Sequence, residues 1–131
     1  MNAVVLDTDT VSLYRNGRLP VSQIRQVHSK LIRVTFVTVG ELHQWALVQR
    51  WGTTTRGGFE LWLSKITVLP YDAMVARTWG AIAAGAQLRG RRRPANDTWV
   101  AACCIDAGLP LLTQNRRDFS DFAEHEGLML L

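Results

Sequence analysis

Four acidic residues, far apart in the chain, are the side chains with the clearest capacity for chemistry. Asp7, Glu41, Asp97 and Asp118 each follow a predicted strand or open a predicted helix. Carboxylates gathered at one site repel one another, which raises their pKa unless a cation compensates. Carboxylate oxygens suit Mg²⁺ or Mn²⁺, and such an ion can acidify and orient a water and stabilise charge on a phosphodiester. These four residues are therefore predicted to be both metal ligands and catalytic groups.

Arginines flank two of these acids. The two basic runs contain Arg89, Arg91, Arg92, Arg93, Arg116 and Arg117. Arginine has planar, bidentate donors that suit phosphate, so an acidic floor with a basic rim fits a nucleic-acid backbone. The net charge of +4 agrees with a polyanionic partner, although many proteins carry such a charge for solubility alone. The combination favours a metal-dependent nuclease with these arginines as its nucleic-acid-binding residues.

A fold that gathers the acids is predicted from the alternation of apolar strands and amphipathic helices. The apolar run at 4–6 is typical of a central parallel strand covered on both faces, and further strands are expected at 32–37, 67–69 and 109–113, with a last edge strand at 127–131. This alternation predicts a three-layer α/β/α sandwich with a mostly parallel sheet of four to five strands. Ligands bind outside the carboxyl ends of such strands, where Asp7 stands. Alternatively, Asp7 or Asp9 only caps the helix that follows.

Several local signals predict where helices begin and end. A helix at 8–14 would be capped by Thr8 or Asp9, and Thr38 with Glu41 has the spacing of a capping box. That second signal explains Glu41 without any catalysis. The glycine-rich stretch 51–58 is expected to be a flexible connection. Asp72 is expected to cap a long helix, and a helix opening near Asn96 would stop at Gly108.

Composition limits the class of protein. At 131 residues and 47% hydrophobic, residues 1–131 are expected to form a single globular domain. No apolar run is long enough to cross a bilayer and no secretory signal is evident, so a soluble, cytoplasmic protein without membrane association is expected. The adjacent Cys103 and Cys104 lie in an apolar helical pattern and are expected to be small buried hydrophobes.

Four blocks of sequence carry a resemblance to a known family. They are Leu6-Asp7-Thr8, Gly40-Glu41-Leu42, the run 96–102 that begins Asn96-Asp97-Thr98, and the run 112–119 that ends Asp118-Phe119. In this order, over essentially the whole chain, they resemble PIN-domain ribonucleases of the VapC toxin family. The resemblance implies an Mg²⁺- or Mn²⁺-dependent endoribonuclease, the toxin of a type II toxin-antitoxin pair. It also implies a VapB-like antitoxin, a homodimer and structured RNA substrates such as tRNA.

Residue by residue, the resemblance places Asp7, Glu41 and Asp97 at the three core acidic positions of the family. Many relatives have an acid where this chain has Asn115, whereas others use the acid of the following Asp-Phe pair. Asp118 is assigned as the fourth acid on that basis. The supporting residues are expected to be Thr8, Thr113, Asn96 and Asn115, with the two threonines orienting ligating carboxylates by hydrogen bonds. Asp9 replaces the family's usual Ser or Asn and is expected to add an outer contact.

Two other functions compete with the nuclease. Asp7-Thr8-Asp9-Thr10-Val11 fits the opening motif of haloacid-dehalogenase-like phosphatases, whose first Asp is a nucleophile, but the only lysines, Lys30 and Lys65, support it poorly. The second competitor is a non-catalytic RNA-binding module with the same fold. The presence of all four acids favours the nuclease over the module.

The tryptophans bear on partner binding. Most of the five, which are Trp45, Trp51, Trp62, Trp79 and Trp99, are expected in the core, since large aromatics are usually well buried. The helices carrying Trp45, Trp51 and Trp62 could also form an apolar groove for an antitoxin helix.

Overall fold

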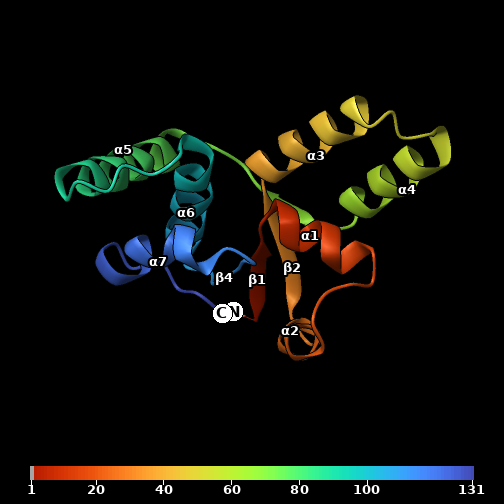
Figure 1. The fold of residues 1–131 in the computed structure, drawn as a ribbon, viewed down its shortest axis with the longest axis horizontal. Helices are drawn as coiled ribbons and strands as arrows, with labels where there is room; N and C mark the ends of the chain where they lie inside the picture. Colours follow the sequence, from red (N-terminus) through yellow and green to blue (C-terminus); the bar gives the residue numbers. More distant parts are fainter. Residues whose placement is uncertain (1) are drawn as a thin grey trace.

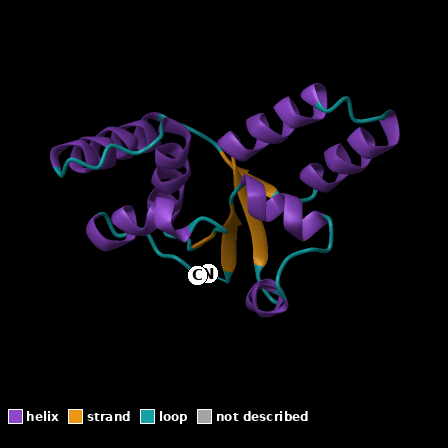
Figure 2. Ribbon diagram, viewed as in Figure 1, coloured by secondary structure: helices purple, strands orange, loops and turns teal. Residues whose placement is uncertain are grey.

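A parallel four-stranded sheet forms the centre of the molecule (Figures 1 and 2). The computed structural model describes residues 2–131. The strands are β1 (Ala3–Leu6), β2 (Leu31–Thr35), β3 (Thr67–Leu69) and β4 (Leu111–Leu112). They lie in the order β3-β2-β1-β4, and Val5 is in register with Arg33 on one side and Leu111 on the other. The chain moves outward from β1 through β2 to β3 and then returns to the far side of β1. The topological switch point therefore lies between β1 and β4, where ligands are expected to bind.

Helices cover both faces of this sheet. Figure 1 shows α5 (Ala73–Leu88), α6 (Ala95–Ala107) and α7 (Arg116–His125) on one side, and α1 (Thr8–Arg15), α3 (Phe36–Val48) and α4 (Thr53–Ser64) on the other. The short α2 (Val21–Val27) lies near the amino end of β2. The structure confirms the predicted three-layer sandwich. Within residues 2–131, no helix combines the length and apolar character that crossing a membrane requires.

The central strand contributes to two hydrophobic cores. Ala3 and Val5 point into the core beneath α5, α6 and α7, whereas Val4 and Leu6 point into the core beneath α1, α3 and α4. All four residues are at most 1% exposed, which confirms that this strand is covered on both faces. Alternate residues of a strand face opposite sides of the sheet, so this one short strand fixes both helical layers.

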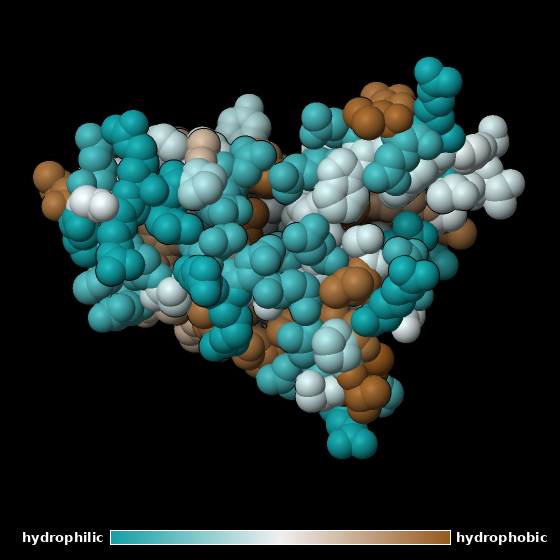
Figure 3. Space-filling model, viewed as in Figure 1, coloured by the Kyte–Doolittle hydropathy of each residue, from teal (hydrophilic) through white to brown (hydrophobic). Residues whose placement is uncertain are grey.

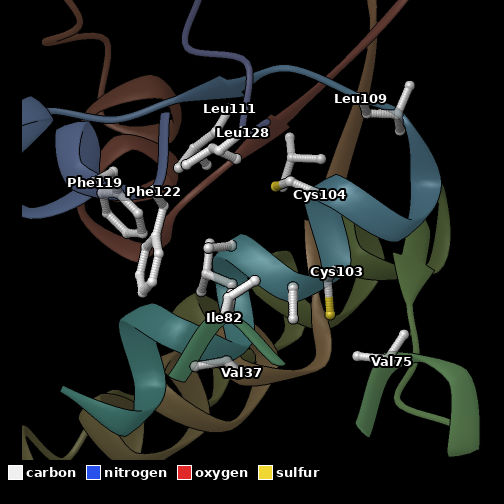
Figure 4. Close-up of a cluster of buried hydrophobic side chains, with 14 of the residues drawn as sticks. Val37, Val75, Ile82, Cys103, Cys104, Leu109, Leu111, Phe119, Phe122 and Leu128 are labelled. Atoms are coloured by element: carbon white, nitrogen blue, oxygen red, sulfur yellow. The ribbon is translucent and has the colours of Figure 1, made fainter. Parts of the chain in front are cut away.

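The paired cysteines lie in the first of these cores (Figure 4). Cys103 and Cys104 are buried and free. Burial raises the pKa of the Cys103 thiol to about 12 and raises that of Cys104 as well. Buried thiols of this kind behave as small hydrophobes rather than nucleophiles, as the sequence predicted.

The start of α3 differs from the sequence prediction. Strand β2 ends at Thr35, whose hydroxyl caps α3 by accepting a hydrogen bond from the Thr38 backbone N–H at 3.4 Å. The predicted Thr38–Glu41 capping box is therefore wrong, because both residues lie inside the helix. The β-branched Val37 faces the core and is 7% exposed, so packing overrides its preference for a strand.

Two other segments also differ from expectation. The stretch 51–58 is not a connection throughout, since α4 begins at Thr53 and includes Gly57. Burial of Phe59, which is 2% exposed and packs edge-on against Trp51, offsets the low helix propensity of glycine. The expected edge strand at 127–131 is reduced to a single parallel bridge between Leu111 and Leu130.

Two predicted helix ends are confirmed. Asp72 caps α5 through its side chain, which accepts a hydrogen bond from the Val75 N–H at 2.9 Å. Helix α6 ends at Gly108, whose φ of 66° lies in the left-handed region that glycine adopts without steric cost. These ends set the length of the two helices that lie on either side of the Arg89–Arg93 loop.

Candidate active site

Asp7 is the best-defined acid of the site. It directly follows β1 and is 8% exposed. Its Oδ1 accepts hydrogen bonds from the Thr10 backbone N–H at 3.2 Å and the Thr10 hydroxyl at 2.6 Å. Its Oδ2 accepts a hydrogen bond from the Thr113 hydroxyl at 2.5 Å. Asp7 therefore caps α1, as the capping alternative for Asp7 predicted, and the other predicted caps, Thr8 and Asp9, lie inside the helix. The second carboxylate oxygen of Asp7 is held by Thr113.

Opposing effects act on the Asp7 carboxyl group. Burial raises its pKa because the charged form loses water. The hydrogen bonds from Thr10 and Thr113 favour the charged form and work in the opposite direction, whereas the charge of Asp9 adds to the rise. The net pKa lies above the ordinary value of 3.8. A buried carboxylate held in this way gains stability from any cation that approaches it.

Glu41 reaches the same region from the adjacent helix. It lies half-buried in α3, and its Oε1 accepts a hydrogen bond from the Thr8 hydroxyl at 2.6 Å. The Thr8 oxygen is also 3.1 Å from the Thr38 hydroxyl. Thr8, in the first turn of α1, thus fixes the direction of a carboxylate that the sequence places on a different helix.

The negative charges of the other three acids act on Asp97. It lies in the first turn of α6 and is half-buried. Its pKa is raised by burial first and then by the negative charges of Asp118, Asp7 and Glu41, while Arg93 partly opposes the rise. Because charge repulsion falls with distance, these effects agree with acids from four separate segments lying near one another.

A cavity of about 100 Å³ lies between these groups. Its polar lining comprises Asp7, Thr8, Asp9, Glu41, Asn96, Asp97 and Asn115, and Trp45, Val100 and Phe119 complete its wall. The Asn115 side-chain amide donates a hydrogen bond to Asp9 Oδ2 at 3.2 Å. Three of the predicted acids therefore share this acidic cavity with three of the predicted supporting residues, Thr8, Asn96 and Asn115.

Asp118 lies beside the acidic cavity rather than in its wall. Its Oδ1 pairs with Arg93 Nη2 at 3.4 Å, and its side chain is 44% exposed. Asn115, not Asp118, lines the acidic cavity itself. Asp118 nevertheless contributes the largest charge effect on Asp97, so it belongs to the electrostatics of the site.

The six predicted RNA-binding arginines have different surroundings. Arg89 pairs with Asp121 at 2.8 Å and with Glu126 at 2.5 Å, which ties the end of α5 to α7. Arg116 Nη1 donates to the Leu131 carbonyl at 2.8 Å, and Arg93 pairs with Asp118 as described above. By contrast, Arg91, Arg92 and Arg117 are exposed. These three are the arginines best placed to meet a phosphate from solution.

The donor set of the acidic cavity fits a hydrated divalent cation. Among residues 2–131, no three His, Cys, Asp or Glu side chains are arranged to ligate one ion directly. Mg²⁺ usually keeps several waters and binds through one or two carboxylates. The buried Asp7, with its raised pKa, and Asp97 offer such carboxylates, and Glu41 lines the same cavity.

Two residues outside the predicted set support Asp7, Thr10 directly and Gln114 through Thr10. Thr10 donates two hydrogen bonds to it, and the Gln114 side-chain amide links Thr10 to Gln23 Oε1. The spacing of Asp7 and Thr10 is that of a cap and the third residue of its helix, so Thr10 could have been found. No sequence signal connects Gln114 to Gln23.

Comparison with known proteins identifies the class defined by this fold and site. The model of the PIN domain family matches residues 4–125. The chain is also 31% identical over 118 residues to Ribonuclease VapC2 of Haemophilus influenzae, with 88% of each sequence covered. The chain therefore belongs to the PIN-domain family. Within that family, it belongs to the VapC group.

Solved structures share the fold over nearly the full chain. The structure of VapBC-1 from nontypeable Haemophilus influenzae has a TM-score of 0.82 at 23% identity, and covers 98% of this chain and 96% of that one. VapBC-5 from Mycobacterium tuberculosis, a member of the VapBC family of toxin-antitoxin systems, has a TM-score of 0.71 at 26% identity and covers 100% and 98%. These matches agree with the predicted PIN-like sandwich.

Proposed function

We propose that this protein is a metal-dependent endoribonuclease and the toxin of a VapBC pair. The observation that carries this proposal is the acidic cavity, where Asp7, Glu41 and Asp97 come together at the switch point of the sheet. The name of the relative Ribonuclease VapC2 supports RNA as the substrate. All four acids are proposed as the catalytic and metal-binding set, with Asp118 acting from beside the cavity.

Each acid has a distinct role in the proposed reaction. A bound Mg²⁺ or Mn²⁺ would supply charge stabilisation at the phosphodiester and would acidify a water. Asp7 is held in a fixed direction by Thr10 and Thr113 and would be the principal ligand. Glu41 is directed by Thr8 and would accept a proton from the attacking water. Asp97, whose pKa is raised, would complete the binding of the cation.

The exposed arginines would hold the RNA backbone at the rim. Arg91 and Arg92 lie in the loop before α6, and Arg117 lies at the start of α7. Such contacts position an RNA without reading its sequence, and their contribution falls as salt rises. Arg89, Arg93 and Arg116 would need to leave their present partners to join them.

A second cavity provides the proposed binding site for a VapB-like antitoxin. It has a volume of about 290 Å³ between α1, α3 and α4, and its lining includes Arg15, Trp45 and Trp51. The guanidinium of Arg15 lies 5.4 Å from the Trp62 ring centre. All five tryptophans are only partly buried, so the expectation that most belong to the core holds in part. Changes at Trp51 and Trp62 should weaken antitoxin binding but not RNA cleavage, and unchanged binding would reject this placement.

Purified protein incubated with total RNA tests the proposal. Cleavage should require Mg²⁺ or Mn²⁺, and sequencing of the new ends should give discrete sites. Asp7→Asn and Asp97→Asn should abolish cleavage. Asp106→Asn is the matched control, because Asp106 lies on α6 but hydrogen bonds Thr78 instead of facing the acidic cavity. Structured RNA such as tRNA, the homodimer and the cytoplasmic location are further expectations from the family resemblance.

The same preparation distinguishes the alternatives. RNA binding without cleavage in either ion would indicate the non-catalytic module. Hydrolysis of small phosphate esters with a phosphorylated Asp7 would indicate the phosphatase, for which the match to the PIN domain over residues 4–125 provides no support. Intact RNA with every divalent ion supplied to a well-folded protein would reject the nuclease.

A further inference from the structure

A further concavity, distinct from the proposed antitoxin site, adjoins the acidic cavity. The nuclease chemistry does not use it. It has a volume of about 360 Å³ and lies between α3 and α6. Its lining comprises Phe36, Val37, Gly40, Glu41, Gln44, Asn96 and Trp99. Glu41 and Asn96 also line the acidic cavity. The two spaces therefore share part of their wall, and an occupant of the concavity would sit next to the bond proposed to be cleaved.

One wall of the concavity is aromatic and held in place. The Trp99 ring is stacked on Trp79, with 5.3 Å between ring centres and an interplanar angle of 25°. The Trp99 ring also meets Phe36 edge-on at 5.7 Å, and Phe36 in turn contacts Tyr71. Aromatic rings stabilised by such contacts offer a preformed surface for another flat ring.

Three other lining residues of the concavity are polar or small. Gln44 and Asn96 are exposed, and each carries an amide with both hydrogen-bond donors and an acceptor. Gly40 contributes no side chain, and a Cβ built there would meet nothing within 4 Å. The volume falls in the range of roughly 300–1,000 Å³ that is usual for small-ligand sites. A flat, polar-edged ring fits these features better than an aliphatic chain or a phosphate.

We propose that this concavity binds one unpaired nucleobase of the RNA, next to the phosphodiester that is cleaved. Proteins recognise single-stranded RNA by stacking splayed bases on aromatic side chains and by hydrogen bonding to their edges. Trp99 and Phe36 provide the apolar wall, and Gln44 and Asn96 provide the edge contacts. This inference rests on the proposed function, and it makes the concavity a determinant of which sequences are cut.

A substitution of Gly40 whose side chain would fill the concavity provides the test. Gly40→Leu places a side chain in the open space and improves helix propensity, so the fold should tolerate it. Gly57→Leu is the matched control: Gly57 also lies in a helix, and a Cβ there would also meet nothing within 4 Å. The probe is a randomised single-stranded RNA library with Mg²⁺ or Mn²⁺, with cut sites mapped by sequencing and the mass of each protein measured in solution.

The expected result depends on base size. Gly40→Leu should lower kcat/KM by about 10- to 100-fold, the range for losing one base–aromatic contact, and the loss should be greater where a purine flanks the cut. Gly40→Ala should cleave nearly as the wild type does. Gln44→Ala should change the flanking-base preference, with a loss of roughly 2- to 10-fold at the preferred base.

Other results would overturn the inference and are distinguishable from failure of the proposed function. If Gly40→Leu cleaves as Gly57→Leu does, no base uses the concavity. If it slows all sequences equally, the substitution has only disturbed the neighbouring Glu41. A change in mass would assign this face to contact with a second copy of the chain. If wild-type protein cleaves no RNA, the proposed function itself fails.

Discussion

Thr113→Val tests how the fold holds the Asp7 carboxylate. Thr113 is 2% exposed, and its hydroxyl donates to Asp7 Oδ2 at 2.5 Å. Valine has a similar shape but no hydroxyl, so it removes this hydrogen bond together with the one that the hydroxyl accepts from the Asn115 N–H at 3.0 Å. Only the bond to Asp7 depends on the charge of its carboxylate. A hydrogen bond to a charged group contributes about 1.5–3 kcal/mol. We therefore expect the free energy of unfolding to fall by about that amount at pH values above the folded-state pKa of Asp7.

The pH dependence separates this effect from a packing defect. The Thr113 hydrogen bond lowers the pKa of Asp7 against the rise that burial causes, so the wild type has a lower folded-state pKa than the variant. The stability difference is complete above both pKa values, and it is lost as pH falls through them. Loss of this hydrogen bond therefore raises the folded-state pKa of Asp7 still further above its ordinary value.

Urea unfolding of wild type and Thr113→Val over a series of pH values measures this difference. Thr113→Ser keeps the hydroxyl and should retain most of the pH dependence of the wild type. RNA cleavage by Thr113→Val should fall about 10- to 100-fold, as for other groups that orient metal-binding residues. A stability loss that is equal at all pH values would refute the proposal that the Thr113 hydroxyl stabilises the charged form of Asp7. Equal pH profiles for the Ser and Val variants would refute it as well.

The remaining predictions concern charge and backbone conformation. Asp97→Asn should reduce the rise in melting temperature that Mg²⁺ gives the wild type, since the raised pKa of Asp97 comes partly from nearby acids that a cation would screen; an equal rise would place the cation elsewhere. Arg89→Met should lower the urea midpoint at neutral pH but much less at acid pH, because Arg89 lowers the pKa of Asp121 and that contribution is lost as pH falls through the folded-state pKa. A midpoint shift independent of pH would show that packing alone matters there. Gly108→Ala should cost roughly 1–2 kcal/mol in unfolding free energy because its φ is 66°, and no change would mean that α6 ends differently.

Local signals in the sequence were sufficient for the layers of the fold and for the position of each acid along the chain. The apolar run at 4–6 indicated a strand buried on both faces, and Asp72 and Gly108 marked helix ends that the structure confirms. These features depend on hydrogen bonds and side-chain periodicity within a few residues. That short range is why they could be predicted without knowledge of the rest of the molecule.

Other local signals were overridden by packing. Valine favours strands and glycine favours loops, yet Val37 and Gly57 both lie in helices. In α3 and α4, burial of Val37 and Phe59 against the core outweighs preferences of roughly 1 kcal/mol or less per residue. The sequence contains the competing terms, but only the assembled core decides which of them is larger.

Contacts between distant segments were decided by tertiary structure alone. The Thr113 hydroxyl reaches Asp7 across 106 positions of sequence because β4 adds to the sheet beside β1. Arg89 was predicted to meet RNA, but the approach of α7 to the end of α5 places it against Asp121 and Glu126. The sequence determined which residues could do chemistry. The strand order and helix packing decided which of them meet, since the energy of a pair of charges or of a hydrogen bond depends on a distance that no local pattern specifies.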